Sequence, residues 1–154
     1  MIPKFRVWVR PKKRMIETND ILSIDYEYEE VETQFIDGLP DDRDLESFLF
    51  KDVILMQSTG LKDKNGKEIF EGDIITTNAY GCIVSFGEYT YFEDEDTQTT
   101  AIGFYLSFLN VTPATYAPFE KFYWDNCEVI GNIHENELDL IMYEAWKFNK
   151  EQEE

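Results

Sequence analysis

The sequence predicts a mainly β, α+β protein whose centre is a small antiparallel β-barrel with an N-terminal β extension and a C-terminal amphipathic helix. Short segments alternate apolar and polar residues, glycine-bearing turns separate these segments closely, and the last segment changes to helical spacing. Closely joined short strands are typical of small barrels. We expect one compact unit with three parts: β-strands and loops at 1–52 packing on the barrel, the barrel at 53–134, and a helix with a tail at 135–154.

The turn signals are densest in the middle of the chain. Thr59-Gly60 is predicted to end a strand, and Glu71-Gly72-Asp73 is predicted to start the next one. Asn65-Gly66 predicts a type I′ hairpin turn, because both central residues of that turn need positive φ. This stretch therefore predicts a small and strongly bent sheet.

The N-terminal part is predicted to be extended except for one short helix. Phe5, Val7 and Val9 alternate with Lys4, Arg6 and Trp8, as in a half-buried strand. Asp44 is expected to cap a helix over residues 45–50. Further strands are predicted at 15–16, 21–28 and 29–35.

The C-terminal half is predicted to be a series of short strands followed by a helix. The strands are expected at 53–57, 74–77, 82–86, 89–92, 102–109 and 127–133. Asn136 is expected to cap the final helix, in which apolar residues recur at helical spacing. That apolar stripe would pack on the barrel or on a second copy.

Several motifs in this chain resemble a known family. They are Leu55–Gln57, Thr59–Ile69, Glu71–Ile74, Lys4–Trp8 and Val129–Asn136. In order and spacing they resemble the YopX-like family of phage and prophage proteins. The resemblance implies a phage origin and an SH3-like β-barrel core. It implies no particular activity, and it assigns no functional residues.

The charge distribution is strongly uneven. The formal net charge is −18, while residues 1–14 contain six basic residues and no acidic one, so the rest of the chain carries −24. An acidic body repels a phosphate backbone, which makes nucleic-acid binding an unlikely function for it. Two interpretations remain open. The acidic surface either keeps the protein soluble, or it imitates nucleic acid and binds a basic partner.

Two groups of residues are candidates for an interaction. Basic residues next to an N-terminal turn could contact nucleic acid, or could form an ordinary charged hairpin loop beside an acidic body. An aromatic-rich segment could stack on bases, or could belong to the core or to a subunit contact. The candidates are Arg10, Lys12, Lys13 and Arg14 in the first group, and Tyr116, Phe119, Tyr123 and Trp124 in the second.

The sequence contains no recognisable catalytic, cofactor or metal motif. His134 is the one histidine, and Cys82 and Cys127 are far apart and are expected to be buried thiols. The acidic residues at 41–46 lack the spacing of a calcium loop. The four adjacent carboxylates at 93–96 are expected to form a solvated loop tip, the alternative being a cation site or an anchor for a basic partner. We therefore expect no enzyme activity, no cofactor and no metal.

These observations favour a cytoplasmic protein-interaction module. The chain has no long apolar run and no apolar signal core near its start, so we expect neither a membrane segment nor secretion. The expected partners are host or phage proteins, and self-association remains open. The alternative is a nucleic-acid-binding or nucleic-acid-mimicking accessory protein of phage replication or host takeover.

Overall fold

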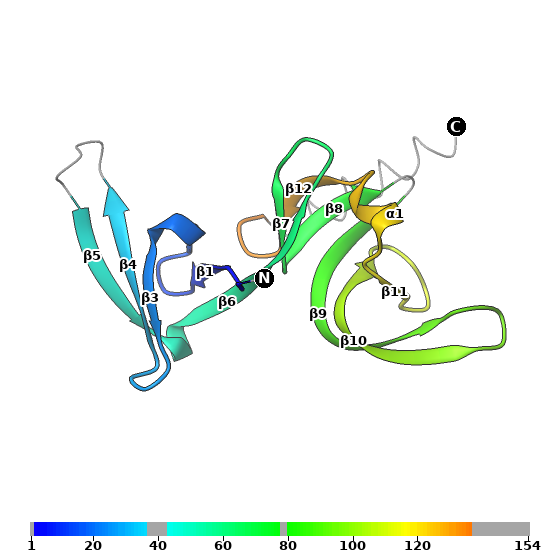
Figure 1. Ribbon diagram of the computed structural model, residues 1–154, viewed down its shortest axis with the longest axis horizontal. Helices are drawn as coiled ribbons and strands as arrows, with labels where there is room; N and C mark the ends of the chain where they lie inside the picture. Colours follow the sequence, from blue (N-terminus) through cyan, green and yellow to red (C-terminus); the bar gives the residue numbers. More distant parts are fainter. Residues whose placement is uncertain (1, 37–42, 78–79, 137–154) are drawn as a thin grey trace. The chain divides into compact units, whose positions relative to one another are not determined.

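Figure 1 shows a computed structural model of the chain, which describes residues 2–36, 43–77 and 80–136. The described part is mainly β, and every strand pair in it is antiparallel. The chain divides into two compact units, Met1–Gln57 and Ser58–Glu154. This boundary lies a few residues beyond the predicted division at residue 52. The predicted packing of residues 1–52 on the barrel stays a prediction.

Unit 1 contains two small sheets. In one, β1 pairs with β2 and with the first part of β6; in the other, β4 lies between β3 and β5. Buried apolar side chains from both sheets form its core. The elements are β1 (Phe5–Val9), β2 (Arg14–Ile16), η1 (Thr18–Asp20), β3 (Ile21–Asp25), β4 (Glu30–Ile36), β5 (Arg43–Leu49), η2 (Phe50–Asp52) and β6 (Val53–Lys62), which continues into unit 2.

The core of unit 1 explains the alternation near the N-terminus. Val7 and Val9 are fully buried and lie opposite Leu55 and Val53 in the β1–β6 pair. The Thr18 hydroxyl donates a hydrogen bond to the Phe5 carbonyl at 2.7 Å, which ties η1 to β1. The predicted N-terminal β-structure is therefore confirmed.

The predicted helix over residues 45–50 is wrong, because this segment is mostly strand β5. Pairing with β4 overrides the weak local helix signal: Phe48 lies opposite Val31, and Glu46 lies opposite Thr33. The predicted strand 21–28 is also too long. It ends at Asp25, whose carboxylate accepts the backbone N–H groups of Glu27 and Tyr28 in a turn.

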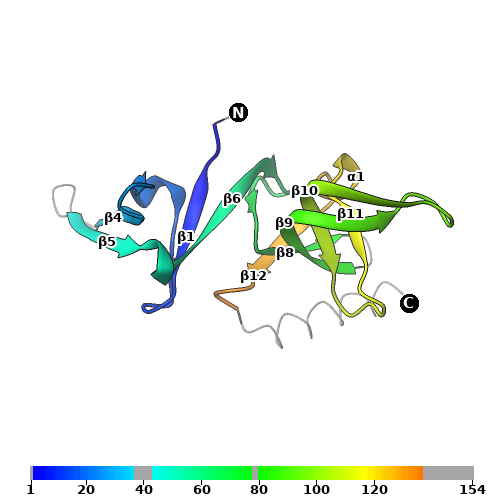
Figure 2. The ribbon, with the colours of Figure 1, turned by 90° about the horizontal axis from the view of Figure 1, so that it is seen from below.

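Unit 2 is built on one curled five-stranded sheet of order β11-β10-β9-β8-β12 (Figures 1 and 2). The end of β6 pairs with β7 beside it, and β12 pairs with β8 across a bulge. The elements are β7 (Glu68–Phe70), β8 (Asp73–Thr77), β9 (Tyr80–Phe92), β10 (Gln98–Phe108), β11 (Tyr116–Pro118), α1 (Lys121–Trp124) and β12 (Glu128–Asn132).

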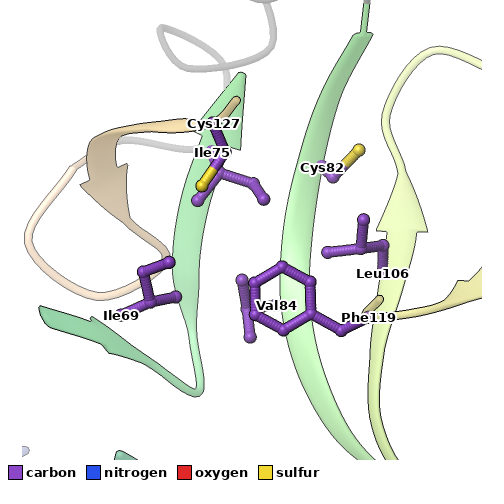
Figure 3. Packing of buried hydrophobic residues seen from close by; sticks show 7 residues of the cluster. All are labelled: Ile69, Ile75, Cys82, Val84, Leu106, Phe119 and Cys127. Carbon is purple, nitrogen blue, oxygen red and sulfur yellow. The ribbon is translucent and has the colours of Figure 1, made fainter. Parts of the chain in front are cut away.

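The core of unit 2 gathers side chains from four strands and from the segments around α1 (Figure 3). Its buried members are Ile69, Ile75, Cys82, Val84, Leu106, Phe119 and Cys127. The two cysteines are free thiols, as expected. Burial raises the pKa of Cys82 to about 12 and that of Cys127 to about 11, so both stay protonated at neutral pH.

The turn after β6 differs from the predicted type I′ hairpin. Asn65 does not have positive φ, whereas Gly66 has a φ of 84°. The reason is the Asp63 carboxylate, which accepts hydrogen bonds from the N–H groups of Asn65 and Lys67, each at 2.9 Å. This bonding turns the chain with one left-handed residue instead of two.

Two other sequence predictions have different outcomes. Strand β6 does not end at Thr59-Gly60 but runs on to Lys62, with a register shift against β7 between Ser58 and Lys62. The predicted final helix lies outside the described residues.

Candidate functional site: the β9–β10 arm

The long β9–β10 hairpin projects from unit 2. Its outer part, residues 88–102, extends away from the curled sheet in both views (Figures 1 and 2). We call this outer part the arm. Since the inner part of the same hairpin contributes Cys82, Val84 and Leu106 to the core, the arm is held at one end by the packed body of unit 2.

A pair of glycines marks the point where the arm begins. Gly87 and Gly103 lie directly opposite each other, with φ values of 146° and 153°. These values belong to a region of backbone space that side chains other than glycine avoid. A Cβ atom at either position would meet nothing within 4 Å, so backbone conformation and not crowding favours glycine here. Paired glycines of this kind allow a sharp bend in a sheet.

The bend brings three tyrosines into one stack on its inner side. The ring centroids of Tyr89 and Tyr105 are 4.6 Å apart at an interplanar angle of 20°, and those of Tyr89 and Tyr91 are 5.6 Å apart at 30°. Tyr105 lies opposite Ser85, four residues from Tyr89, so a straight strand would separate them by about 13 Å. The short ring distance therefore depends on the bend. We call Tyr89, Tyr91 and Tyr105 the tyrosine stack.

Two carboxylates lie close to the tyrosine stack. The Tyr91 hydroxyl donates a hydrogen bond to Glu93 Oε1 at 3.4 Å. Burial, followed by the charge of Glu120, raises the pKa of Tyr89; burial, followed by the charge of Glu93, raises the pKa of Tyr91. Glu120 directly follows Phe119, whose backbone N–H donates a hydrogen bond to the Phe104 carbonyl of β10 at 3.3 Å. The stack is thus an aromatic surface in a negative field.

The other face of the hairpin carries exposed apolar side chains. Phe86, Phe92 and Ile102 are 47%, 67% and 77% exposed, and side-chain alternation places them opposite to the tyrosines. On this face Glu88 lies opposite Ile102, and the hydroxyls of Thr90 and Thr100, 3.1 Å apart, lie between Ile102 and Phe92. We call Phe86, Phe92 and Ile102 the apolar strip. Large exposed apolar groups on a projecting element are typical of interaction surfaces.

The tip of the arm is entirely acidic. In the turn Glu93–Asp96, the Asp94 carboxylate accepts hydrogen bonds from the N–H groups of Asp96 and Thr97 at 2.8 Å. From Tyr80 to Glu120 the sequence contains six acidic residues and no lysine or arginine. In the described part of the chain, no salt bridge involves the carboxylates of this tip.

The basic residues predicted near the N-terminus are largely engaged within unit 1. Lys12 and Arg14 both form ion pairs with Glu46 of β5, the second at 3.2 Å. Hydrogen bonds from these two side chains lower the pKa of Glu46. Arg10 donates to the Lys51 carbonyl at 3.1 Å, while Lys13 is exposed in the turn with a φ of 48°.

The predicted aromatic candidates are mostly part of the core of unit 2. Phe119 is buried, and Tyr123 and Trp124 pack against the same cluster. Tyr116 is exposed on β11, and its ring meets that of Tyr105 edge-on at 5.8 Å. Of the four, Tyr116 alone extends the surface of the tyrosine stack.

The sequence prediction missed the residues that make the arm distinctive. Tyr89, Tyr91, Glu120 and Ile102 were not among the candidates. One signal in the sequence points to them, namely the absence of any basic residue between Tyr80 and Glu120. The bend that brings the tyrosines together depends on the cross-strand pairing of two glycines, which the sequence does not show.

Two classes of site are not seen in the part of the chain that the structure describes. Among these residues, no group of three or more histidine, cysteine, aspartate or glutamate side chains is placed to hold a metal ion. None of the described helices has the length and apolar character needed to span a bilayer.

Comparisons with known proteins identify the family. No curated protein matches the chain. Among solved structures, the crystal structure of protein EF1440 from Enterococcus faecalis is similar, with 30% sequence identity and a TM-score of 0.54; the match covers 91% of this chain and 99% of that chain. A family model described as YopX protein matches residues 4–139. The chain therefore belongs to the YopX family.

Proposed function

We propose that this protein is a non-catalytic protein-interaction module of phage or prophage origin, and that it contacts its partner through the β9–β10 arm. The observation that carries the proposal is the apolar strip, which leaves Phe92 and Ile102 more than half exposed on a projecting element. Burying such side chains in an interface contributes favourable free energy. We also propose an SH3-like barrel for unit 2, supported by its curled antiparallel sheet.

The charge of the arm defines the kind of partner. With six acidic residues and no basic one from Tyr80 to Glu120, this region complements a basic protein surface and repels an acidic one. The carboxylates would steer the approach of the partner, while the apolar strip would supply most of the affinity. Such an interface weakens as salt increases.

The acidic tip favours a second candidate function, nucleic-acid mimicry by an accessory protein of phage replication or host takeover. Four successive carboxylates at Glu93–Asp96 resemble a short row of phosphates. In this case the basic partner would itself bind DNA, and DNA would compete with the arm. Direct nucleic-acid binding has less support, because Lys12 and Arg14 are paired with Glu46.

Affinity capture from a bacterial lysate, followed by purification of the captured protein, tests the proposal. Ile102→Ser and Phe92→Ser together remove most of the apolar strip. Leu45→Ser is the matched control, because Leu45 is a comparably exposed apolar residue on a strand of unit 1, at 59%. We expect the purified partner to bind the wild type and Leu45→Ser equally, and not to bind the double variant.

The outcomes separate the candidate functions. Equal binding of all three proteins to the purified partner would contradict the arm as the contact surface. Displacement of the partner by added duplex DNA would support mimicry, and simultaneous binding of DNA and this protein to the partner would contradict it.

A further inference from the structure

We infer that the tyrosine stack, together with Glu93 and Glu120, binds arginine side chains of a basic segment in the partner protein. This inference rests on the proposed function. It concerns the face of the arm that carries the tyrosine stack, which would bind cations, whereas the opposite face carries the apolar strip. Three observations support it: the geometry of the rings, the position of the carboxylates and the sign of the charge around them.

The ring geometry provides aromatic faces for a planar cation. Tyr105, Tyr89 and Tyr91 stack in that order, with interplanar angles of 20° and 30°, so the stack ends in an outer ring, Tyr91. Tyr89 and Tyr91 are each partly exposed. A guanidinium group stacks on tyrosine through its planar face and is attracted by the negative face of the ring.

Two carboxylates add negative charge at the stack. Glu93 accepts the hydrogen bond of the Tyr91 hydroxyl, and Glu120 acts electrostatically on both Tyr89 and Tyr91. An arginine lying on the ring of Tyr91 would therefore have the Glu93 carboxylate beside it, and the charge of Glu120 would add to the negative field. Arginine can form two parallel hydrogen bonds to one carboxylate, whereas lysine offers a point charge. This combination favours arginine over lysine.

The charge around the stack argues against a second copy of this chain as the occupant. The region from Tyr80 to Glu120 contains no basic residue, so two arms would repel each other. The arginines of the basic turn of unit 1 are already engaged, because Arg14 is held by Glu46 and Arg10 donates to the Lys51 carbonyl; the exposed residue of that turn, Lys13, is a lysine. The site therefore fits a basic segment of a different protein.

Calorimetric titration of the full chain with a hexa-arginine peptide at low salt tests the inference. Tyr89→Leu removes the central ring, and Glu120→Gln removes one carboxylate with little change in shape. Tyr28→Leu and Glu17→Gln are the matched controls, since they change an exposed tyrosine and an exposed glutamate of unit 1. A hexa-lysine peptide of equal charge serves as the second ligand.

We expect hexa-arginine to bind the wild type and both controls with equal affinity. Tyr89→Leu and Glu120→Gln should each bind it about three- to tenfold more weakly, the range set by one cation–π contact or one charged hydrogen bond. Hexa-lysine should bind the wild type more weakly than hexa-arginine. In wild-type NMR spectra, hexa-arginine should shift the ring signals of Tyr89 and Tyr91, a readout that does not depend on any variant folding.

Several results would overturn the inference. They are an absence of binding, equal affinity of the site variants and the controls, equal affinity for the two peptides, and unchanged ring signals.

An experiment with the captured partner distinguishes a failure of this inference from a failure of the proposed function. If the partner still binds Tyr89→Leu and Glu120→Gln but not the apolar-strip variant, the arginine site is wrong and the interaction module stands. If the partner binds the apolar-strip variant as well, the proposed function itself fails.

Discussion

Two hairpin turns of unit 2 use the same local device and have opposite structural roles. At Asp63 and at Asp94, one carboxylate oxygen accepts two backbone N–H groups of the turn that follows. The second oxygen of Asp63 also accepts the Val129 N–H of the distant segment that forms β12, at 2.9 Å. The turn at Asp63 is therefore tied into the body of unit 2, while the turn at Asp94 forms the tip of the arm.

The comparison shows how little of a residue's role is set by its local conformation. Both aspartates shape a turn, and both have a lowered pKa because of backbone hydrogen bonds. The difference comes from one long-range contact, from Asp63 to Val129. In the body of unit 2, the Asp63 carboxylate accepts a hydrogen bond from a backbone N–H far away in the sequence. In the arm, the carboxylates of the tip are exposed to solvent.

The largest expected effect is that of Asp63→Asn. An asparagine can keep the hydrogen bonds of Oδ1, but its amide N–H₂ would then face the Val129 N–H, so that two donors meet. We expect a loss of about 2–3 kcal/mol in the free energy of unfolding, measured by urea denaturation. Asp94→Asn is the control and should lower the urea midpoint much less, because the hydrogen bonds at that turn use Oδ1 alone, which an asparagine can keep. Equal effects of the two changes would remove the distinction between the turns.

The same contact predicts a pH dependence. Burial by itself raises the pKa of Asp63, but hydrogen bonds from Val129, Lys67 and Asn65 outweigh it, so the pKa in the folded protein lies below its ordinary 3.8. A lowered pKa stabilises the folded state above 3.8, and this contribution is lost as the pH falls through the folded value. The stability difference between wild type and Asp63→Asn should therefore be constant near neutral pH and shrink below pH 3.8. Urea titrations at several pH values measure this. A stability difference between wild type and Asp63→Asn that grows as the pH falls would contradict the prediction.

The next largest effect is expected at the base of the arm. Gly87→Val places a branched side chain at a φ of 146°, which costs about 1–2 kcal/mol in backbone strain. Because a Cβ atom there meets no neighbour, the effect should come from unbending the hairpin and not from a clash in the core. We expect the NOE contacts between the rings of Tyr89 and Tyr105 to disappear while the signals of the core remain. Thr100→Val, at an exposed position of the arm, should preserve these contacts.

A smaller effect is expected in unit 1, where the basic turn has an acidic partner. Glu46→Gln removes the ion pairs with Lys12 and Arg14, which are partly exposed, so the free energy of unfolding should fall by only about 0.5 kcal/mol. The same change releases two cations. We expect no retention of the wild type on a DNA column at low salt and weak, salt-sensitive retention of Glu46→Gln. Strong retention of the wild type on the column would show that the ion pairs with Glu46 do not prevent this turn from binding DNA.

The smallest effect on stability is expected at the apolar strip. Ile102 is 77% exposed, so Ile102→Ser should not change the urea midpoint measurably. Leu106→Ala is the matched change in the body of unit 2, because Leu106 lies on the same strand and is fully buried; it should cost about 2–5 kcal/mol. A large loss of stability in Ile102→Ser would mean that the strip is part of the fold and not a displayed surface.

The sequence predicted the fold well where local signals and tertiary contacts agree. The alternation around Val7 and Val9, the presence (though not the type) of a turn at Gly66 and the closing strand Glu128–Asn132 all follow from short-range patterns. Residues 45–50 were predicted wrongly because Asp44 and the apolar spacing resemble a short helix. Pairing of Phe48 and Glu46 with β4 decides that segment instead.

The candidate site was predicted poorly, for a physical reason. Phe119 was a sensible candidate from composition, but its burial depends on contacts with distant strands. The tyrosine stack depends on Gly87 facing Gly103, so its geometry follows from register and not from local sequence. The charge of the region was visible, since no basic residue occurs from Tyr80 to Glu120.

The glycine pair has one further consequence, for the modularity of this protein. The buried core residues of β9 and β10 are Cys82, Val84 and Leu106. All three lie between the glycine pair and the body of unit 2, and none lies between the pair and the tip of the arm. The outer segment can therefore be exchanged for another hairpin, or shortened to a tight turn, without altering the packed interior. Transplanting residues 88–102 onto a relative with a different outer hairpin would then transfer the choice of partner while the recipient keeps its own thermal stability.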